Sequence, residues 1–99
     1  MQVAQGHPSA ALASYEAGLT IRERLAQSDP GNAAWQRDLA ISYGKIALAY
    51  LKSHRVDQMR DALATGRAVL ARLIAQHPDS SQWQQDLAWF DQQIASLKH

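Results

Sequence analysis

Cysteine is absent from the 99 residues of this chain. Disulfide bonds, thiolate nucleophiles and zinc–thiolate sites are therefore excluded. Long hydrophobic runs are missing too: the longest, Ile46 to Leu51, is far shorter than the ~20 apolar residues that cross a bilayer. Residues 1–5 carry neither a basic cluster nor an apolar stretch, so no secretory signal is visible. We expect a single domain over residues 1–99, located in the cytoplasm and without contact to a membrane.

An excess of either charge is also lacking, because ten Lys and Arg residues oppose nine Asp and Glu residues and leave a formal net charge of +1. Domains that bind nucleic acid usually carry a basic stripe, so this balance argues against such a partner. Four arginines nevertheless lie within or just before the predicted helix 57–76. They could form a row that faces phosphates, but such residues more often form a solvated helix face. These arginines are Arg55, Arg60, Arg67 and Arg72.

Signatures of catalysis and metal binding are missing as well. No serine stands in a Gly-x-Ser-x-Gly motif, and no glycine-rich phosphate loop follows a strand. Asp57 and Asp61 could form an acid–base couple or a cation site, but the helix dipole also favours aspartate in a first helical turn. The histidines fall near predicted turns or the terminus, whereas a zinc site needs converging ligands. We therefore expect no enzymatic activity, no metal and no cofactor. The histidines are His7, His54, His77 and His99.

What the sequence does contain is an internal repeat with an offset of 48 residues. Residues 30–50 return as residues 78–95 without a gap, and the same offset aligns parts of the segments before them. A repeat of this length is typical of stacked helical units. It predicts an all-α chain built of antiparallel helical hairpins. The identical pairs are Gly18 with Gly66, Arg24 with Arg72, Leu25 with Leu73, Pro30 with Pro78, Trp35 with Trp83, Gln36 with Gln84, Asp38 with Asp86, Leu39 with Leu87, Ala40 with Ala88, Ile46 with Ile94, and Ala47 with Ala95.

Apolar residues spaced three and four apart predict four amphipathic helices. Proline, glycine, aspartate, asparagine and serine cluster before the second and the fourth helix, where they mark turns and supply helix caps. No segment shows the pattern of a strand. The predicted helices cover about residues 9–27, 33–52, 57–76 and 81–97.

Residues that the repeat preserves suggest three kinds of local contact. Gly18 and Gly66 lie within helices, where glycine costs roughly 1 kcal/mol relative to alanine. We expect two helices to cross closely at these positions, and a tolerated weak position is the alternative. Trp35 and Trp83 share the context Trp-Gln-x-Asp-Leu-Ala and are expected in equivalent, mostly buried sites near the two turns. Equal distances from the turn centres predict an ion pair across each hairpin. These pairs are Arg24 with Asp38 and Arg72 with Asp86.

Residues 40–73 resemble the 34-residue pattern of tetratricopeptide repeats. The family's spaced aromatic, aliphatic, small and tyrosine residues are matched by Tyr43, Ile46, Ala47 and Tyr50. Two positions depart from the pattern. His54 stands where the family has a glycine at the bend, and Met59 stands where it has a small residue.

The 48-residue repeat is longer than the 34-residue pattern, and the additional residues are expected to lengthen the helix ends. Residues 15–25 are similar to the longer repeats of kinesin light chain. The resemblance implies a right-handed α-solenoid fragment of four helices. It also implies a non-enzymatic scaffold that binds a peptide or partner protein on a concave face, which the first helix of each pair mostly builds.

The expected groove takes residues from the helices 33–52 and 81–97. Gly44 is expected to leave room for a ligand backbone. The alternative is that the apolar members only pack between helices. The expected partner-binding residues are Ile41, Gly44, Lys45, Leu48, Lys52, Trp89, Gln92 and Ser96.

A homo-oligomerisation module is the alternative function. About three repeats are usually needed to bury their faces, and no helix follows 81–97 to cover its apolar residues. We expect a homodimer formed by this helix, with a contribution from the helix 9–27, or neighbouring repeats of a longer chain. Val3 aligns with Leu51 and is expected to close a missing helix, as in a fragment or in a short protein that starts within a repeat. The expected self-association residues are Trp89, Phe90, Ile94 and Leu97.

Overall fold

The computed structural model describes residues 7–97 and forms four α-helices, with no strand in this range. The all-α prediction is confirmed, and the predicted helices match the observed ones closely. The expectations that concern Val3 and His99 lie outside the described residues. The helices are α1 (His7–Ser28), α2 (Ala33–Lys52), α3 (Val56–Gln76) and α4 (Ser81–Ser96).

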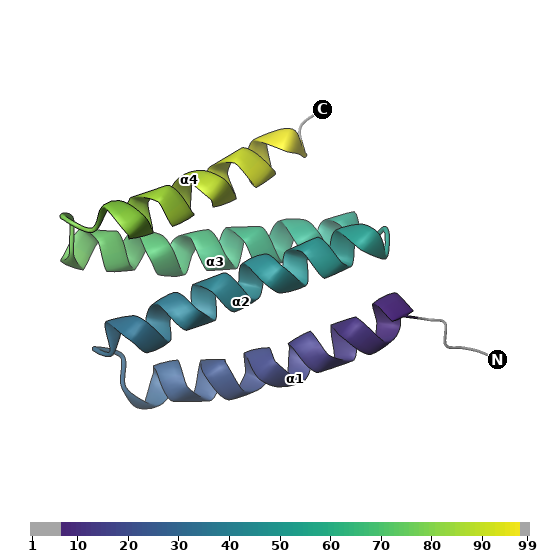
Figure 1. The fold of residues 1–99 in the computed structure, drawn as a ribbon, viewed down its shortest axis with the longest axis horizontal. Helices are drawn as coiled ribbons and strands as arrows, with labels where there is room; N and C mark the ends of the chain where they lie inside the picture. Colours follow the sequence, from purple (N-terminus) through teal and green to yellow (C-terminus); the bar gives the residue numbers. More distant parts are fainter. Residues whose placement is uncertain (1–6, 98–99) are drawn as a thin grey trace.

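The helices lie side by side in chain order and alternate in direction (Figure 1). The principal extents of the molecule are 50 × 35 × 18 Å, so it is a thin layer rather than a sphere. The α1–α2 and α3–α4 turns lie at one end of the layer, and the α2–α3 turn lies at the other (Figure 1). This arrangement leaves α2 and α3 in the middle and α1 and α4 at the edges.

The repeated residues begin α2 and α4 in the same way. Asn32 caps α2, and its side-chain oxygen accepts a hydrogen bond from the backbone N–H of Trp35 at 3.1 Å. Ser80 caps α4 and accepts from the backbone N–H of Trp83 at 3.3 Å. Asn and Ser are favoured at this position because they satisfy an N–H group that the helix leaves unpaired. The repeat therefore encodes a helix start.

The glutamine that follows each tryptophan completes this start. The amide nitrogen of Gln36 donates to the carbonyl of Pro30 at 3.5 Å, and that of Gln84 donates to the carbonyl of Pro78 at 2.7 Å. Each bond ties the first turn of a helix back to the connection before it. The Gln36 amide also donates to the carbonyl of Ala26 at 3.0 Å and so reaches the end of α1.

The α2–α3 turn has a different construction. His54 has a φ of 60°, the left-handed region that favours glycine. Its N–H donates to the Leu51 carbonyl at 3.0 Å, and the N–H of Arg55 donates to the Tyr50 carbonyl at 2.8 Å. These two bonds form the Schellman motif that ends many helices. The bend at which the tetratricopeptide pattern has a glycine is therefore present here, with His54 in the strained position.

The core lies along α2 and α3, and the edge helices add a few residues to it. Phe90 of α4 is 1% exposed and inserts toward the central helices. A Cβ on Gly66 would lie 2.7 Å from the Phe90 ring and 3.0 Å from Cβ of Tyr43, so the predicted close crossing at Gly66 is confirmed. The prediction is wrong for Gly18 in this chain, because only the side chain of Arg22 approaches it. The buried apolar residues are Leu12, Ala26, Leu39, Ala40, Ile46, Ala47, Ala49, Met59, Ala62, Leu63, Val69, Leu70, Leu73 and Phe90.

The two tryptophans are equivalent at the backbone but not in their packing. Both are mostly buried, as predicted, although neither is fully enclosed. Trp83 packs against the core and stands edge-on to His77, with 5.3 Å between the ring centroids. Trp35 is not among the partly buried residues that pack on the core. The repeat therefore preserves the cap more closely than the side-chain environment.

Neither predicted ion pair across a hairpin forms within residues 7–97. Asp86 instead accepts a hydrogen bond from Nε of Arg37 at 2.9 Å, which joins α2 to α4. Arg24 and Asp38 are both exposed. Equal distance from a turn fixes the height of a residue along its helix but not the side on which it stands, and for this reason the prediction was wrong.

Candidate functional site

A cleft of about 190 Å³ lies between α2 and α4. Ile41, Leu48 and the edge of Trp89 give it apolar walls, and Phe90 lies beneath them. Two charged residues, Lys45 and Asp86, complete the lining. We call this set the α2–α4 cleft: Ile41, Gly44, Lys45, Leu48, Asp86, Trp89 and Phe90.

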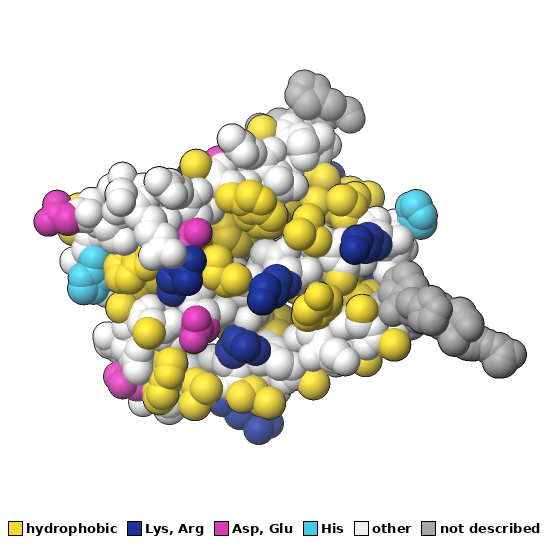
Figure 2. Space-filling model, viewed as in Figure 1, with side chains coloured by type: hydrophobic (Ala, Val, Ile, Leu, Met, Phe, Trp, Pro, Cys, Tyr) yellow, Lys and Arg dark blue, Asp and Glu magenta, His cyan; other side chains and the backbone are white. Residues whose placement is uncertain are grey.

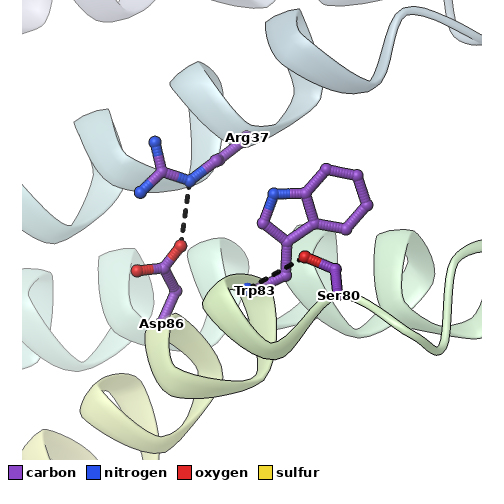
Figure 3. A network of polar contacts seen from close by, with 4 residues as sticks. All are labelled: Arg37, Ser80, Trp83 and Asp86. Carbon is purple, nitrogen blue, oxygen red and sulfur yellow. Dashed lines mark hydrogen bonds and ion pairs between the residues drawn. The ribbon is translucent and has the colours of Figure 1, made fainter.

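An ion pair near one end of the α2–α4 cleft links its two walls. Arg37 reaches from α2 to Asp86 on α4, and the indole of Trp83 stands in the same gap between the helices (Figure 3). Both partners of the pair are less than one third exposed. Partial burial strengthens such a contact relative to a fully solvated pair. The pair therefore helps to hold α2 and α4 at a fixed separation.

Five of the eight predicted groove residues come together in this cleft: Ile41, Gly44, Lys45, Leu48 and Trp89. They do so because positions 41, 45 and 48 lie on one face of α2, three and four residues apart.

The other three predicted residues lie elsewhere. Lys52 lines a neighbouring cavity of about 190 Å³ between α1 and α2, together with Tyr15, Lys45 and Leu48. Gln92 and Ser96 are exposed on α4 and line neither cavity. Because Lys45 and Leu48 belong to both cavities, the two form adjoining hollows on one face.

Basic and apolar side chains alternate along this face of the molecule, as Figure 2 shows. Arg37, Lys45 and Lys52 follow one another on the same side of α2, with Ile41 and Leu48 between them. Arg37 is paired with Asp86, whereas no ion pair among residues 7–97 includes either lysine. Lys45 and Lys52 are both exposed and therefore present positive charge beside the apolar hollows.

Gly44 does not leave the open space that the sequence suggested. A Cβ at this position would lie 3.1 Å from the ring of Trp89 and 3.3 Å from that of Phe90. The chain's own aromatic side chains therefore occupy the room beside Gly44. The glycine allows α4 to approach α2, and a ligand would lie over Trp89 rather than against the Gly44 backbone.

The predicted self-association residues do not form an exposed patch. Phe90 is buried and belongs to the core, because its ring fills the space over Gly44 and Gly66. Trp89, Ile94 and Leu97 are half-buried and pack against the core. The exposed large apolar residues lie on the other helices instead. They are Tyr15, Ile21, Leu25, Leu48, Leu51 and Val56.

A larger cavity of about 540 Å³ lies on other surfaces of α1, α2 and α3. Glutamine, threonine and charged side chains form much of its lining, and it includes Tyr43, which donates a hydrogen bond to Glu23 of α1. Burial raises the pKa of Tyr43 to about 12, and Glu23 adds to the shift. The phenol therefore stays protonated and joins α1 to α2. We prefer the α2–α4 cleft as a binding site because it combines an aromatic wall, aliphatic walls and an unpaired cation.

Tyr50 makes a second contact of this kind. Its hydroxyl donates to Glu16 of α1 at 3.3 Å, and its pKa is raised by burial and by the charge of Glu16. Tyr43 and Tyr50 are the tyrosines that carry the family resemblance. In this chain they form two successive hydrogen bonds between the antiparallel helices α1 and α2, so their role here is structural.

Asp57 and Asp61 lie in the first two turns of α3. Asp57 accepts a hydrogen bond from its neighbour Arg60 at 3.4 Å, and both side chains are exposed. Among residues 7–97, no group of three or more His, Cys, Asp and Glu residues could hold a metal ion. Over the same part of the chain, no helix combines the length and the hydropathy needed to cross a membrane.

Comparison with protein-family models, with curated proteins and with solved structures gave no match for this chain.

Proposed function

We propose that the chain is a tetratricopeptide-like, right-handed stack of helical hairpins that binds a peptide or a segment of a partner protein in the α2–α4 cleft. In this proposal it catalyses no reaction, needs no cofactor and works in the cytoplasm. The observation that carries the proposal is the cleft itself, in which Ile41, Leu48 and Trp89 lie beside the unpaired charge of Lys45.

The internal repeat supports the architecture in this proposal. α2 and α4 start with equivalent caps, Asn32 and Ser80, and occupy the same position of the 48-residue repeat, and the cleft lies between them. A surface between equivalent helices of successive repeats is where solenoids usually bind extended partners.

The lining specifies the chemistry of the partner segment. A cleft of about 190 Å³ is smaller than a pocket for a drug-sized molecule, but it accommodates one or two side chains of a peptide. Ile41, Leu48 and Trp89 favour an aliphatic or aromatic side chain. Lys45 and Lys52, which flank Leu48 on α2, favour a carboxylate next to that side chain.

Selection from a displayed peptide library tests the proposal. The chain is used as bait, and peptides that also bind the Leu48→Glu variant are removed. The matched control is Leu51→Glu, because Leu51 is 45% exposed, close to the 39% of Leu48, but lines neither the α2–α4 cleft nor the neighbouring cavity. We expect selected peptides to bind the wild type and the Leu51→Glu variant, and to lose at least about tenfold in affinity for Leu48→Glu.

Trp89 reports directly on the cleft. In the variant Trp35→Phe/Trp83→Phe, the remaining tryptophan is Trp89, and a peptide that lies over it should change its fluorescence. The proposal is wrong if selected peptides bind Leu48→Glu as well as the wild type and leave the Trp89 emission unchanged.

A further inference from the structure

Equivalent positions of α1 and α3 differ sharply in burial. On α1, three large apolar residues are between 39% and 57% exposed. Their counterparts 48 residues later on α3 are no more than 4% exposed. α3 lies between α2 and α4, whereas α1 packs on α2 alone among the described helices. The difference therefore identifies a face of α1 that lacks a neighbour. The pairs are Tyr15 with Leu63, Ile21 with Val69, and Leu25 with Leu73.

α4 shows the corresponding difference from α2. Ala40 and Ala47 of α2 are fully buried, whereas Ala88 and Ala95, their counterparts on α4, are exposed. α2 lies between α1 and α3, and α4 packs on α3. Small residues at these positions let α2 approach a neighbouring helix closely. On α4 the same small residues form an uncovered face.

The repeat indicates what covers each face. In the middle of the molecule, α3 packs on α2. By the same packing, a helix that corresponds to α2 would cover the face of α1 that lacks a neighbour. A helix that corresponds to α3 would cover the uncovered face of α4. One copy of the chain carries both of these helices at its edges, because α4 corresponds to α2 in the repeat and α1 corresponds to α3.

We propose that α4 of one copy docks on α1 of a second copy and reproduces the packing of α2 on α3. The contact is head-to-tail, so each copy keeps one free face and the assembly extends by further copies. This surface is separate from the α2–α4 cleft, and the proposal goes beyond the peptide-binding function.

Charge at the two faces supports a second copy as the occupant. In the central contact, Cβ of Tyr43 would lie 3.0 Å from a Cβ on Gly66. The repeat replaces Tyr43 by Asp91 and Gly66 by Gly18, and the guanidinium of Arg22 lies over Gly18, with Nη1 3.1 Å from the Cβ position. Docking therefore brings the Asp91 carboxylate of one copy toward Arg22 of the next, while one of its oxygens, Oδ1, already accepts a hydrogen bond from Arg67 of α3 in its own copy. Arg22 donates a long hydrogen bond of 3.5 Å from Nη1 to the Gly18 carbonyl, but no ion pair among residues 7–97 includes it, so its charge is available for this contact.

Sedimentation of the wild-type chain over a concentration series tests the proposal. We expect the average mass to rise with concentration up to about 1 mM, the weak end of the usual affinity range. Ile21→Glu and Ala95→Glu should each abolish this rise, since each adds an unpaired charge to one docking face. Both sites are exposed, so the helix content measured by circular dichroism should not change. Val56→Glu is the matched control, because Val56 is 42% exposed and is the first residue of α3, which is not one of the two docking helices.

Mixing the two variants distinguishes this contact from other forms of association. Ile21→Glu keeps an intact α4, and Ala95→Glu keeps an intact α1, so an equimolar mixture should form a one-to-one dimer that does not extend. A symmetric contact between two α1 helices would instead leave Ala95→Glu dimeric on its own. That result, or a wild type that stays monomeric throughout the series, overturns the proposal.

Discussion

α1 and α3 occupy the same position of the repeat but differ in how much of each is buried. α3 contributes seven residues to the core, spread from its first turn to its last. α1 contributes Leu12 and Ala26, near its two ends, and leaves Ile21 and Leu25 exposed between them. The difference follows from their neighbours, because α3 is covered on two sides and α1 on one. In this chain, the same position of the repeat is therefore core or surface depending on which helix lies next to it.

The largest expected effect comes from removing the side chain that covers α3 from the α4 side. Phe90→Ala should lower the free energy of unfolding by about 3–5 kcal/mol, since it empties a fully buried aromatic site. Urea denaturation at dilute concentration measures this change. The matched control is Ile21→Ala on the less buried helix, for which a change within about 0.5 kcal/mol is expected. A loss below about 1 kcal/mol for Phe90→Ala would show that α4 is not part of the core.

Gly66 of α3 and Gly18 of α1, which the repeat pairs, test the comparison between these helices more directly. The larger effect is expected at Gly66. Gly66→Ala places a methyl group 2.7 Å from the Phe90 ring and 3.0 Å from Tyr43 Cβ. We expect a loss of about 1–3 kcal/mol, because the neighbours must shift to relieve the overlap. The same denaturation experiment applies. An unchanged or increased stability would mean that α3 is not covered as closely as the structure has it.

Gly18→Ala, at the equivalent position of α1, should have the opposite sign. Its methyl group meets only the guanidinium of Arg22, the flexible end of a side chain. Alanine should therefore raise the free energy of unfolding by up to about 1 kcal/mol through its higher helix propensity. Opposite signs at these two positions confirm the comparison between α1 and α3, and equal signs contradict it.

An effect that is absent at neutral pH concerns the hydrogen bonds that join α1 to α2. The pKa of Tyr43 is raised from 10.0 to about 12 in the folded chain, so the folded state keeps its proton more tightly than the unfolded state. The contribution of this group to stability is fully present below pH 10 and is lost as the pH rises from 10 toward 12. Hydrogen exchange across this range should show α1 becoming less protected. Tyr43→Phe, which has no phenol proton to lose, should remove this part of the pH dependence.

The helices and their starts were open to prediction because their determinants are local. Apolar spacing located all four helices, and the turn and cap residues that cluster before the second and the fourth helix indicated where α2 and α4 start. The cleft was also partly accessible, since Ile41, Lys45 and Leu48 share one face of a single helix. Each of these features depends on residues within a few turns of one another.

Contacts between separate helices depended on the tertiary structure. The sequence paired Asp86 with Arg72, but the rotation of the helices brings it to Arg37. It assigned Phe90 to an outer surface, but α4 is rotated so that this ring lies over Gly66.

The amino-acid pattern therefore determined which segments are helical and which residues lie on one side of each helix. How those sides meet was decided only in three dimensions. Helix rotation and the presence of a neighbour are properties of the packed pair, and a periodic pattern within one helix does not specify them. For this reason Gly18 and Gly66, identical in the repeat, lie in different surroundings.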